Sequence, residues 1–187
     1  MNIVLIGYRA TGKSTVGKIL SAKLKIAFWD TDLMVEKNMA MPVKEIVALH
    51  GWDYFRAKEK ETIKTLTQKG ACVIATGGGV VLDKENIDLL KQAGVIIWLN
   101  APGHDIIDRL KRDACNKAIR PQFTSGNIDQ ETADVMKRRL PLYETAADYT
   151  VNTLGKSATQ VAKEIYQYLR KSGKLAKIIK SEETNKI

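Results

Sequence analysis

Short apolar runs alternate along the chain with longer segments in which apolar residues recur every three or four positions. Continuous apolar runs predict buried strands, whereas a recurrence of three or four predicts helices with one apolar face. Alternation of the two is typical of a parallel sheet with helices on both faces, so we predict an α/β fold. The expected strands are NIVLI (2–6), IAFW (26–29), CVIAT (72–76), VIIWL (95–99) and DYTV (148–151).

Helical periodicity fills the segments between these strands. The first expected helix begins near Lys13 and carries apolar residues along one face. The segment 113–127 (DACNKAIRPQFTSGN) is polar and interrupted by proline and glycine, so we expect it to be a mobile lid. The other expected helices begin near Thr31 and cover 51–68, 83–92, 103–112, 129–146 and 157–171.

Length and composition favour one domain. A chain of 187 residues with 44% hydrophobic content is long enough for one well-buried α/β domain and short for two. We assign residues 1–170 to this domain and 171–187 to a basic, flexible C-terminal tail. Cys72 and Cys115 lack metal-ligand spacing and suggest no disulfide framework. No signal peptide fits the start, and no apolar run approaches the roughly 20 residues that span a bilayer, so we expect a cytoplasmic protein. We also expect it to be a monomer.

The chain is basic, with a formal net charge of +9. The tail from Lys171 onward contributes five lysines against two glutamates, and such terminal blocks are usually solvated. Basic residues interleaved with aromatic ones, as used to bind single strands, are not evident. We therefore expect neither a nucleic-acid partner nor a membrane partner, and the charge instead suits binding of small polyanions.

The segment GYRATGKST, Gly7 to Thr15, follows the first apolar run and fits the phosphate-loop pattern G-x-x-x-x-G-K-[ST]. The chemistry requires a strand, a turn through glycines, and backbone N–H groups at a helix start that point at one anion. Lys13 is expected to reach the β- and γ-phosphates of a nucleotide, and the Ser14 hydroxyl to bind Mg²⁺. The sequence therefore predicts an ATP site at the carboxyl end of the first strand.

Two aspartates follow the second strand in FWDTDLM. Ligands of open α/β sheets bind beyond the carboxyl ends of the strands, so Asp30 and Asp32 can both lie near the nucleotide. One carboxylate can belong to the metal shell and the other can accept hydrogen bonds from a substrate hydroxyl. Alternatively, Asp30 caps the following helix and Asp32 lies in its first turn, favoured there by the helix dipole.

Further cationic residues and glycines come at the ends of later strands. Arg56 and Glu59 are one helical turn apart, and three glycines, 77–79, follow the third strand, where backbone can approach a ligand closely. Arg120 lies in the expected lid and Arg139 in RRLPLYE. A phosphoryl-transfer site needs cations over the transferring charge, and an acidic acceptor needs a forked donor for its carboxylate.

The ordered motifs GYRATGKST, WDTD, GWDYFRAKE, TGGGVV, IRP and RRLPLYE resemble the shikimate kinase family, from Ile3 to about Leu169. The resemblance implies a small three-layer phosphate-loop kinase with a five-stranded parallel sheet, a lid and a separate acceptor-binding helical segment. It implies transfer of the ATP γ-phosphate, with Mg²⁺, to the 3-hydroxyl of shikimate in the pathway to aromatic amino acids.

The resemblance also implies a role for each site residue. Lys13, Asp32 and Arg120 would be catalytic, with Asp32 orienting the acceptor hydroxyl and Arg120 reaching the phosphates. Ser14 and Asp30 would belong to the Mg²⁺ shell. Shikimate would be bound by Asp32, Arg56, Gly78, Gly79 and Arg139. ATP would be bound by Gly7, Ala10, Thr11, Gly12, Lys13, Ser14, Thr15, Arg109, Arg120 and Lys156.

The sequence departs from the family pattern at a few positions. Tyr8 and Arg9 are bulkier than the usual loop residues, and we expect their side chains to point outward from the phosphate cradle. Trp52 stands where the family has glutamate, and the adenine-loop segment VNTLGKS lacks its proline. The catalytic positions are kept while the adenine side differs, so the nucleotide preference does not follow from the sequence.

Three other functions share part of this pattern. A gluconate-type kinase would share the phosphate loop and an acceptor carboxylate, and a nucleoside monophosphate kinase would share the loop and the lid. A regulatory module could bind nucleotide without turnover, but Lys13, Asp32 and Arg120 are all retained. The expected mechanism is direct in-line transfer, without a phosphoenzyme.

Overall fold

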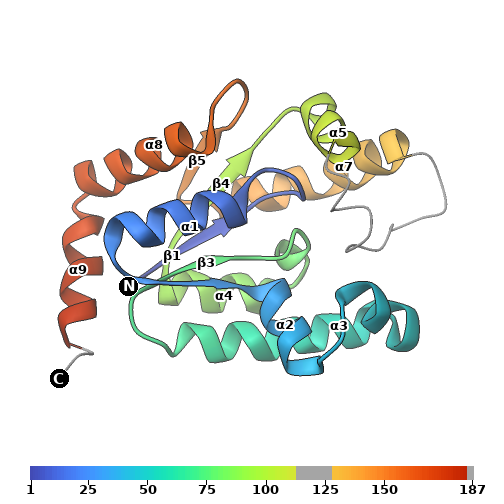
Figure 1. Ribbon diagram of the computed structural model, residues 1–187, viewed down its shortest axis with the longest axis horizontal. Coiled ribbons are helices and arrows are strands. Elements are labelled where there is room, and N and C mark those ends of the chain that lie inside the picture. The colour runs from blue at the N-terminus through green and yellow to red at the C-terminus, as the bar shows by residue number, and fades with distance from the viewer. Residues whose placement is uncertain (113–127, 185–187) are drawn as a thin grey trace.

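The computed structural model of the chain describes residues 1–112 and 128–184. The segment expected to form the lid, 113–127, lies outside the described residues, and so do Cys115 and Arg120. Five strands form one parallel sheet in the order β2-β3-β1-β4-β5 (Figure 1). They are β1 (Asn2–Ile6), β2 (Ala27–Asp30), β3 (Cys72–Ala75), β4 (Gly94–Asn100) and β5 (Tyr149–Asn152).

Helices cover both faces of the sheet (Figure 1), which confirms the α/β prediction. Alternate residues of β1 point to opposite faces: Ile3 packs with α1 and α8, whereas Val4 packs with α3, α4 and α7. The helices are α1 (Lys13–Leu24), α2 (Thr31–Met39), α3 (Val43–Thr67), α4 (Lys84–Ala93), α5 (Gly103–Arg112), α7 (Ile128–Ala146), α8 (Ala158–Lys171) and α9 (Lys174–Thr184), with a short 3₁₀ turn η1 (Val80–Leu82).

Helix α3 begins at Val43, eight residues before the predicted start at position 51. Gly51 has φ 81° and ψ 172°, so two helical stretches meet there at a kink. The added stretch is held by a small apolar cluster in which Val43 and Ile46 pack with Val35 of α2. Together α2 and the kinked first half of α3 form a pair of packed helices (Figure 1), and α2 also contacts β2.

The C-terminal segment is not the flexible tail that we predicted, at least as far as Thr184. Residues Lys174–Thr184 form α9, which packs against α8 (Figure 1). Leu175 and Ile178, one turn apart, are 9% and 0% exposed and belong to the largest apolar cluster. Lysines recur along α9 at positions 174, 177 and 180, but two apolar side chains on one face are enough to bind the helix to the core.

No helix among the described residues combines the length and apolar character needed to span a membrane.

Candidate active site

The phosphate loop connects β1 to α1 through residues with positive φ. Gly7 has φ 141°, Ala10 has φ 62°, and Gly12, the residue before α1, has φ 90°. A Cβ on Gly7 would also lie 2.5 Å from the carbonyl oxygen of Leu99 at the end of β4. Only glycine fits there, because both the backbone angle and the contact exclude a side chain. The loop is therefore braced against the neighbouring strand.

Lys13 is held inside this loop. Its Nζ donates to the carbonyl oxygens of Gly7, at 2.8 Å, and Tyr8, at 2.7 Å, and the residue is 6% exposed. Thr11 also bonds back to the loop, donating from its hydroxyl to Tyr8 O at 2.8 Å. The ammonium group is thus fixed where the helix start and the loop N–H groups already favour an anion.

Asp30 fits both alternatives left open by the sequence. Its Oδ1 accepts from the backbone N–H groups of Asp32, at 3.1 Å, and Leu33, at 3.3 Å, so it caps α2. Its Oδ2 accepts from the Ser14 hydroxyl at 2.6 Å. The cap orients one oxygen of the carboxylate and leaves the other beside the phosphate loop, next to the expected Mg²⁺ ligand.

Asp32 and Glu59 converge on Gly77. A Cβ at Gly77 would lie 2.5 Å from Asp32 Oδ1 and 2.6 Å from Glu59 Oε1, so no larger residue fits between the two carboxyl groups. The side chain of Glu59 is fully buried, and burial together with the nearby Asp32 raises its pKa, while Arg56 opposes this rise. The spacing of Glu59 from Arg56 is visible in the sequence, but nothing in the sequence indicates a role for Glu59.

Arg56 lies across the three consecutive glycines 77–79, which we call the glycine loop. Its Nη1 donates to Glu59 Oε2 at 2.6 Å, and a Cβ on Gly79 would collide with its guanidinium. The guanidinium carbon also lies 5.4 Å from the ring centroid of Trp52. Trp52, which replaces the family's glutamate, therefore supports the arginine through its ring face rather than through a charge.

Arg139 approaches the same loop from α7. Its Nη1 donates to Gly78 O at 2.9 Å, and the hydroxyl of Tyr143, one turn further on, donates to the same oxygen at 2.5 Å. Burial lowers the pKa of Arg139, and the nearby Arg56 adds to this effect. Two guanidinium groups so placed favour an anion between them. The RRLPLYE motif contained Tyr143, but periodicity alone gave no sign of its hydrogen bond.

Tyr8 and Arg9 do not point outward, contrary to our expectation. They are 2% and 8% exposed. The Tyr8 ring packs with Ile106 and Met136 in a cluster between α5 and α7. The two bulky side chains of the loop are therefore buried in the protein and not directed into solvent.

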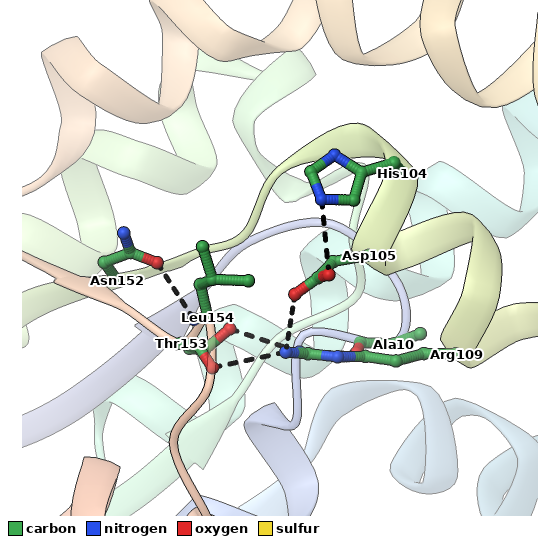
Figure 2. Close-up of polar contacts among 7 residues, drawn as sticks. All are labelled: Ala10, His104, Asp105, Arg109, Asn152, Thr153 and Leu154. Carbon is green, nitrogen blue, oxygen red and sulfur yellow. Dashed lines mark hydrogen bonds and ion pairs between the residues drawn. The ribbon is translucent and has the colours of Figure 1, made fainter.

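Three of the residues expected to bind ATP, Arg109, Lys156 and Thr15, are more exposed to solvent than Glu59 and Arg139. Arg109 contacts Ala10 of the phosphate loop and Thr153 after β5 (Figure 2). Lys156 lies on the surface, where its Nζ donates to Glu164 at 2.6 Å, and Thr15 is exposed on α1. The structure thus brings the expected phosphate, metal and acceptor residues to one end of the sheet, whereas Lys156 is directed into a surface ion pair.

A phosphate loop on a parallel sheet, with a lysine inside it and two arginines around an adjacent glycine loop, defines a phosphate-loop kinase of small molecules. The sequence model described as shikimate kinase matches residues 9–170. The chain therefore belongs to the shikimate kinase family. Within it, the chain is 42% identical over 164 residues to a shikimate kinase of Thermodesulfovibrio yellowstonii, which covers 88% of this chain and 92% of that protein.

Solved structures of shikimate kinases are also similar to this chain. A shikimate kinase from Acinetobacter baumannii in complex with shikimate has a TM-score of 0.86 and 33% identity, covering 91% of this chain and 93% of that one. A shikimate kinase from Aquifex aeolicus has a TM-score of 0.78 and 32% identity, covering 92% and 98%. A gluconokinase from Sinorhizobium meliloti, with a TM-score of 0.50 and 12% identity, shares the fold alone.

Proposed function

We propose that the protein transfers the γ-phosphate of ATP to the 3-hydroxyl of shikimate, giving shikimate 3-phosphate and ADP for aromatic amino acid synthesis. The observation that carries this proposal is the pair Arg56 and Arg139 on the glycine loop, next to Asp32 and the phosphate loop. The relative solved with shikimate supports the choice of acceptor.

The acceptor side provides complementary groups for a hydroxylated carboxylic acid. Arg56 and Arg139 can bind its carboxylate through forked, charge-assisted hydrogen bonds. Asp32, at the other side of Gly77, can accept hydrogen bonds from its hydroxyl groups and orient the one that attacks. The backbone of Gly78 and Gly79 allows the ring to approach closely.

Ser14 and Asp30 fit a magnesium ion. Their side-chain oxygens are 2.6 Å apart at the helix start, and hydroxyl and carboxylate oxygens are the ligands that Mg²⁺ prefers. Such an ion would take its remaining ligands from phosphate oxygens and water. When bound, the ion would neutralise charge on the β- and γ-phosphates.

The residues of the chain then act by positioning and by charge. Lys13 stabilises negative charge on the transferring group, and Arg120 of the expected lid adds a second cation as transfer proceeds. Asp32 fixes the direction of the attacking hydroxyl, which makes in-line attack effectively unimolecular. Closure of the lid would exclude water and limit hydrolysis of ATP. We further propose that the protein acts in the cytoplasm as a monomer.

A coupled assay of ADP release tests this function. We expect shikimate to stimulate release by orders of magnitude over buffer, and gluconate and AMP to leave it unchanged. The matched control is Lys13→Ala, purified in the same way, which should abolish the stimulation and so exclude a contaminating kinase. Equal stimulation by gluconate or AMP, or release that ignores the acceptor, would contradict the proposal.

A further inference from the structure

Tyr8 of the phosphate loop carries a buried hydroxyl group. The residue is 2% exposed, and its ring packs with Ile106 and Met136 between α5 and α7. Its hydroxyl oxygen has no hydrogen-bond partner among the residues that the structure describes. Burial of a hydroxyl group is costly unless a hydrogen bond replaces those it made with water. The Tyr8 hydroxyl therefore calls for a partner in its surroundings.

Tyr8 lines a small cavity between the phosphate loop, the end of β4, α5 and α7. The volume of the cavity is about 10 Å³, close to the room that one water molecule needs. Thr11 of the phosphate loop and Tyr143 of α7 line the same cavity. Three side chains with hydroxyl groups thus surround a space of this size, and a buried water molecule typically makes about three hydrogen bonds.

The three hydroxyl groups are suited to different parts in such a site. Tyr143 donates its single proton to Gly78 O, at 2.5 Å, and Thr11 donates its own to Tyr8 O, at 2.8 Å. Toward the cavity these two can therefore only accept, whereas the Tyr8 hydroxyl can donate. A water molecule that accepts from Tyr8 and donates to Tyr143 satisfies both tyrosines, and its second proton suits Thr11.

Tyr8 also lies within electrostatic reach of the two residues that donate to Gly78 O. Burial raises the pKa of Tyr143, Arg139 opposes this rise, and Tyr8 adds to it. Burial lowers the pKa of Arg139, and both Tyr143 and Tyr8 oppose this change. The side chain of Tyr8 is therefore close enough to influence both donors to this carbonyl oxygen.

The backbone of Tyr8 belongs to the same region. A Cβ on Gly78 would lie 3.4 Å from Arg9 N and 3.7 Å from the carbonyl carbon of Tyr8, so the glycine loop packs closely on the phosphate loop. The carbonyl oxygen of Tyr8 accepts from Lys13 Nζ at 2.7 Å. Tyr8 thus contacts the phosphate-loop lysine through its backbone and shares a cavity with Tyr143 through its side chain.

We propose that Tyr8 is a positioning residue for the acceptor and that it acts through one water molecule bound between its hydroxyl and that of Tyr143. The water orients the Tyr143 hydroxyl, which together with Arg139 holds Gly78 O at the acceptor site. A phosphate-loop residue thereby contributes to shikimate affinity without touching either substrate. The inference rests on the proposed function, because it concerns the acceptor of that reaction.

The kinetic test is a double-mutant cycle of wild type, Tyr8→Phe, Tyr143→Phe and the double variant. Phenylalanine keeps the packing of each ring and removes only the hydroxyl. We expect Tyr8→Phe to raise KM for shikimate about two- to fourfold, as for one lost hydrogen bond, and to leave kcat and KM for ATP unchanged. The double variant should resemble Tyr143→Phe alone, because both changes break the same chain of hydrogen bonds.

Tyr149→Phe is the matched control, since its ring stacks on Tyr168 and does not line the cavity. It should behave as wild type. The proposal is overturned if the KM for shikimate is unchanged in Tyr8→Phe, or if the double variant shows the product of the two single increases. A rise in both KM values with a fall in kcat would also overturn it, because this would indicate damage to the phosphate loop.

A crystal structure of the wild-type protein, at a resolution that shows ordered water, tests the bound water directly. We expect density for one water molecule within about 3.0 Å of both tyrosine hydroxyl oxygens. Direct contact between the two hydroxyls, or no water between them, would overturn the proposal. This measurement does not depend on turnover. If the wild-type protein fails to phosphorylate shikimate, the proposed function fails, and the crystal structure still decides the water site.

Discussion

The two sides of the active site are built differently. On the acceptor side, Glu59 is fully buried, Arg139 is 7% exposed, and their hydrogen bonds to Arg56 and Gly78 measure 2.6 and 2.9 Å. On the nucleotide side, Arg109 is 32% exposed at its side chain and its contacts measure 3.1 to 3.5 Å. Buried charges are costly unless their partners are fixed, so the acceptor side tolerates little change.

The difference indicates where selectivity resides. A site whose polar groups are buried and oriented rejects a ligand that leaves one of them unpaired, often by a large factor. A partly exposed site loses little binding free energy when its ligand changes, because water can replace the hydrogen bonds that the new ligand does not make. We therefore expect substitutions on the acceptor side to have large effects and substitutions on the nucleotide side to have small ones.

The largest effect is expected for Arg139→Ala. Losing a charge-assisted pair to the acceptor carboxylate should raise KM for shikimate by about tenfold or more, with a smaller change in kcat, because the contact is made in both ground and transition states. Arg139→Lys should rescue poorly, since a point charge cannot replace a bidentate fork. Arg138→Ala, an exposed neighbour on α7, is the control and should behave as wild type. A fall in kcat alone would assign Arg139 to the transferring phosphate.

The second-largest effect is expected for Glu59→Ala. Removing the partner of Arg56 frees that guanidinium, and the KM for shikimate should rise by about five- to tenfold while the KM for ATP is unchanged. Glu61→Ala, on the same helix but exposed, should have no such effect. An equal rise in the two KM values of Glu59→Ala would show general damage to the fold rather than a role in positioning.

The buried carboxyl group of Glu59 also predicts a pH dependence of stability. Burial raises its pKa above the ordinary value of 4.5, so its contribution to stability is complete below that pH and is lost as the pH rises through the folded-state pKa. Glu59→Gln does not titrate. Its free energy of unfolding, relative to wild type, should therefore increase between about pH 5 and pH 8, as measured by urea unfolding. A difference that is constant with pH would show that Glu59 is ionised throughout.

Tyr143→Phe should have a moderate effect. It removes one of the two donors to Gly78 O, and a neutral hydrogen bond of this kind corresponds to about a three- to fivefold rise in the KM for shikimate. The stacking of the ring on Trp98 is retained, so the fold should be preserved. Tyr149→Phe, whose ring stacks on Tyr168 away from the glycine loop, is the control. An unchanged KM for shikimate would mean that Arg139 alone positions this carbonyl.

The smallest effect is expected for Lys156→Ala. The resemblance placed Lys156 among the ATP-binding residues, but its ammonium is paired with Glu164 on the surface. Surface pairs contribute little, so the KM for ATP should change by less than about twofold. A tenfold rise would show that Lys156 leaves Glu164 to bind the nucleotide.

Much of this arrangement could be predicted from the sequence. Short apolar runs predicted the first four strands, the short segment DYTV predicted the fifth, and glycines at fixed offsets predicted the phosphate loop, because these signals are local. Asp30 and Asp32 were placed correctly since the end of a parallel strand points to the ligand crevice. The metal and substrate roles of these residues remain predictions.

The remaining features depend on contacts between segments far apart in the chain. The inward direction of Tyr8, the hydrogen bond of Tyr143 to Gly78, and the bridge made by Arg109 have no periodic signature. The packing of α9 was missed because lysines recur along it, and within residues 174–180, whose burial the structure describes, the buried side chains are Leu175 and Ile178. Local sequence patterns predict helices and strands, whereas these contacts depend on how the helices and strands pack against one another.

The position of β1 has a consequence for synthesis of the protein. Ile3 pairs with Val73 on one side and with Val95 on the other, and Gly7 rests on Leu99. During translation the first strand must therefore remain unpaired until its partners have left the ribosome, with the cost of closing two long loops. The phosphate loop is made before β3 and β4, and its assembly must wait for both of them. A ribosome-bound fragment that ends before β4 should not retain ATP.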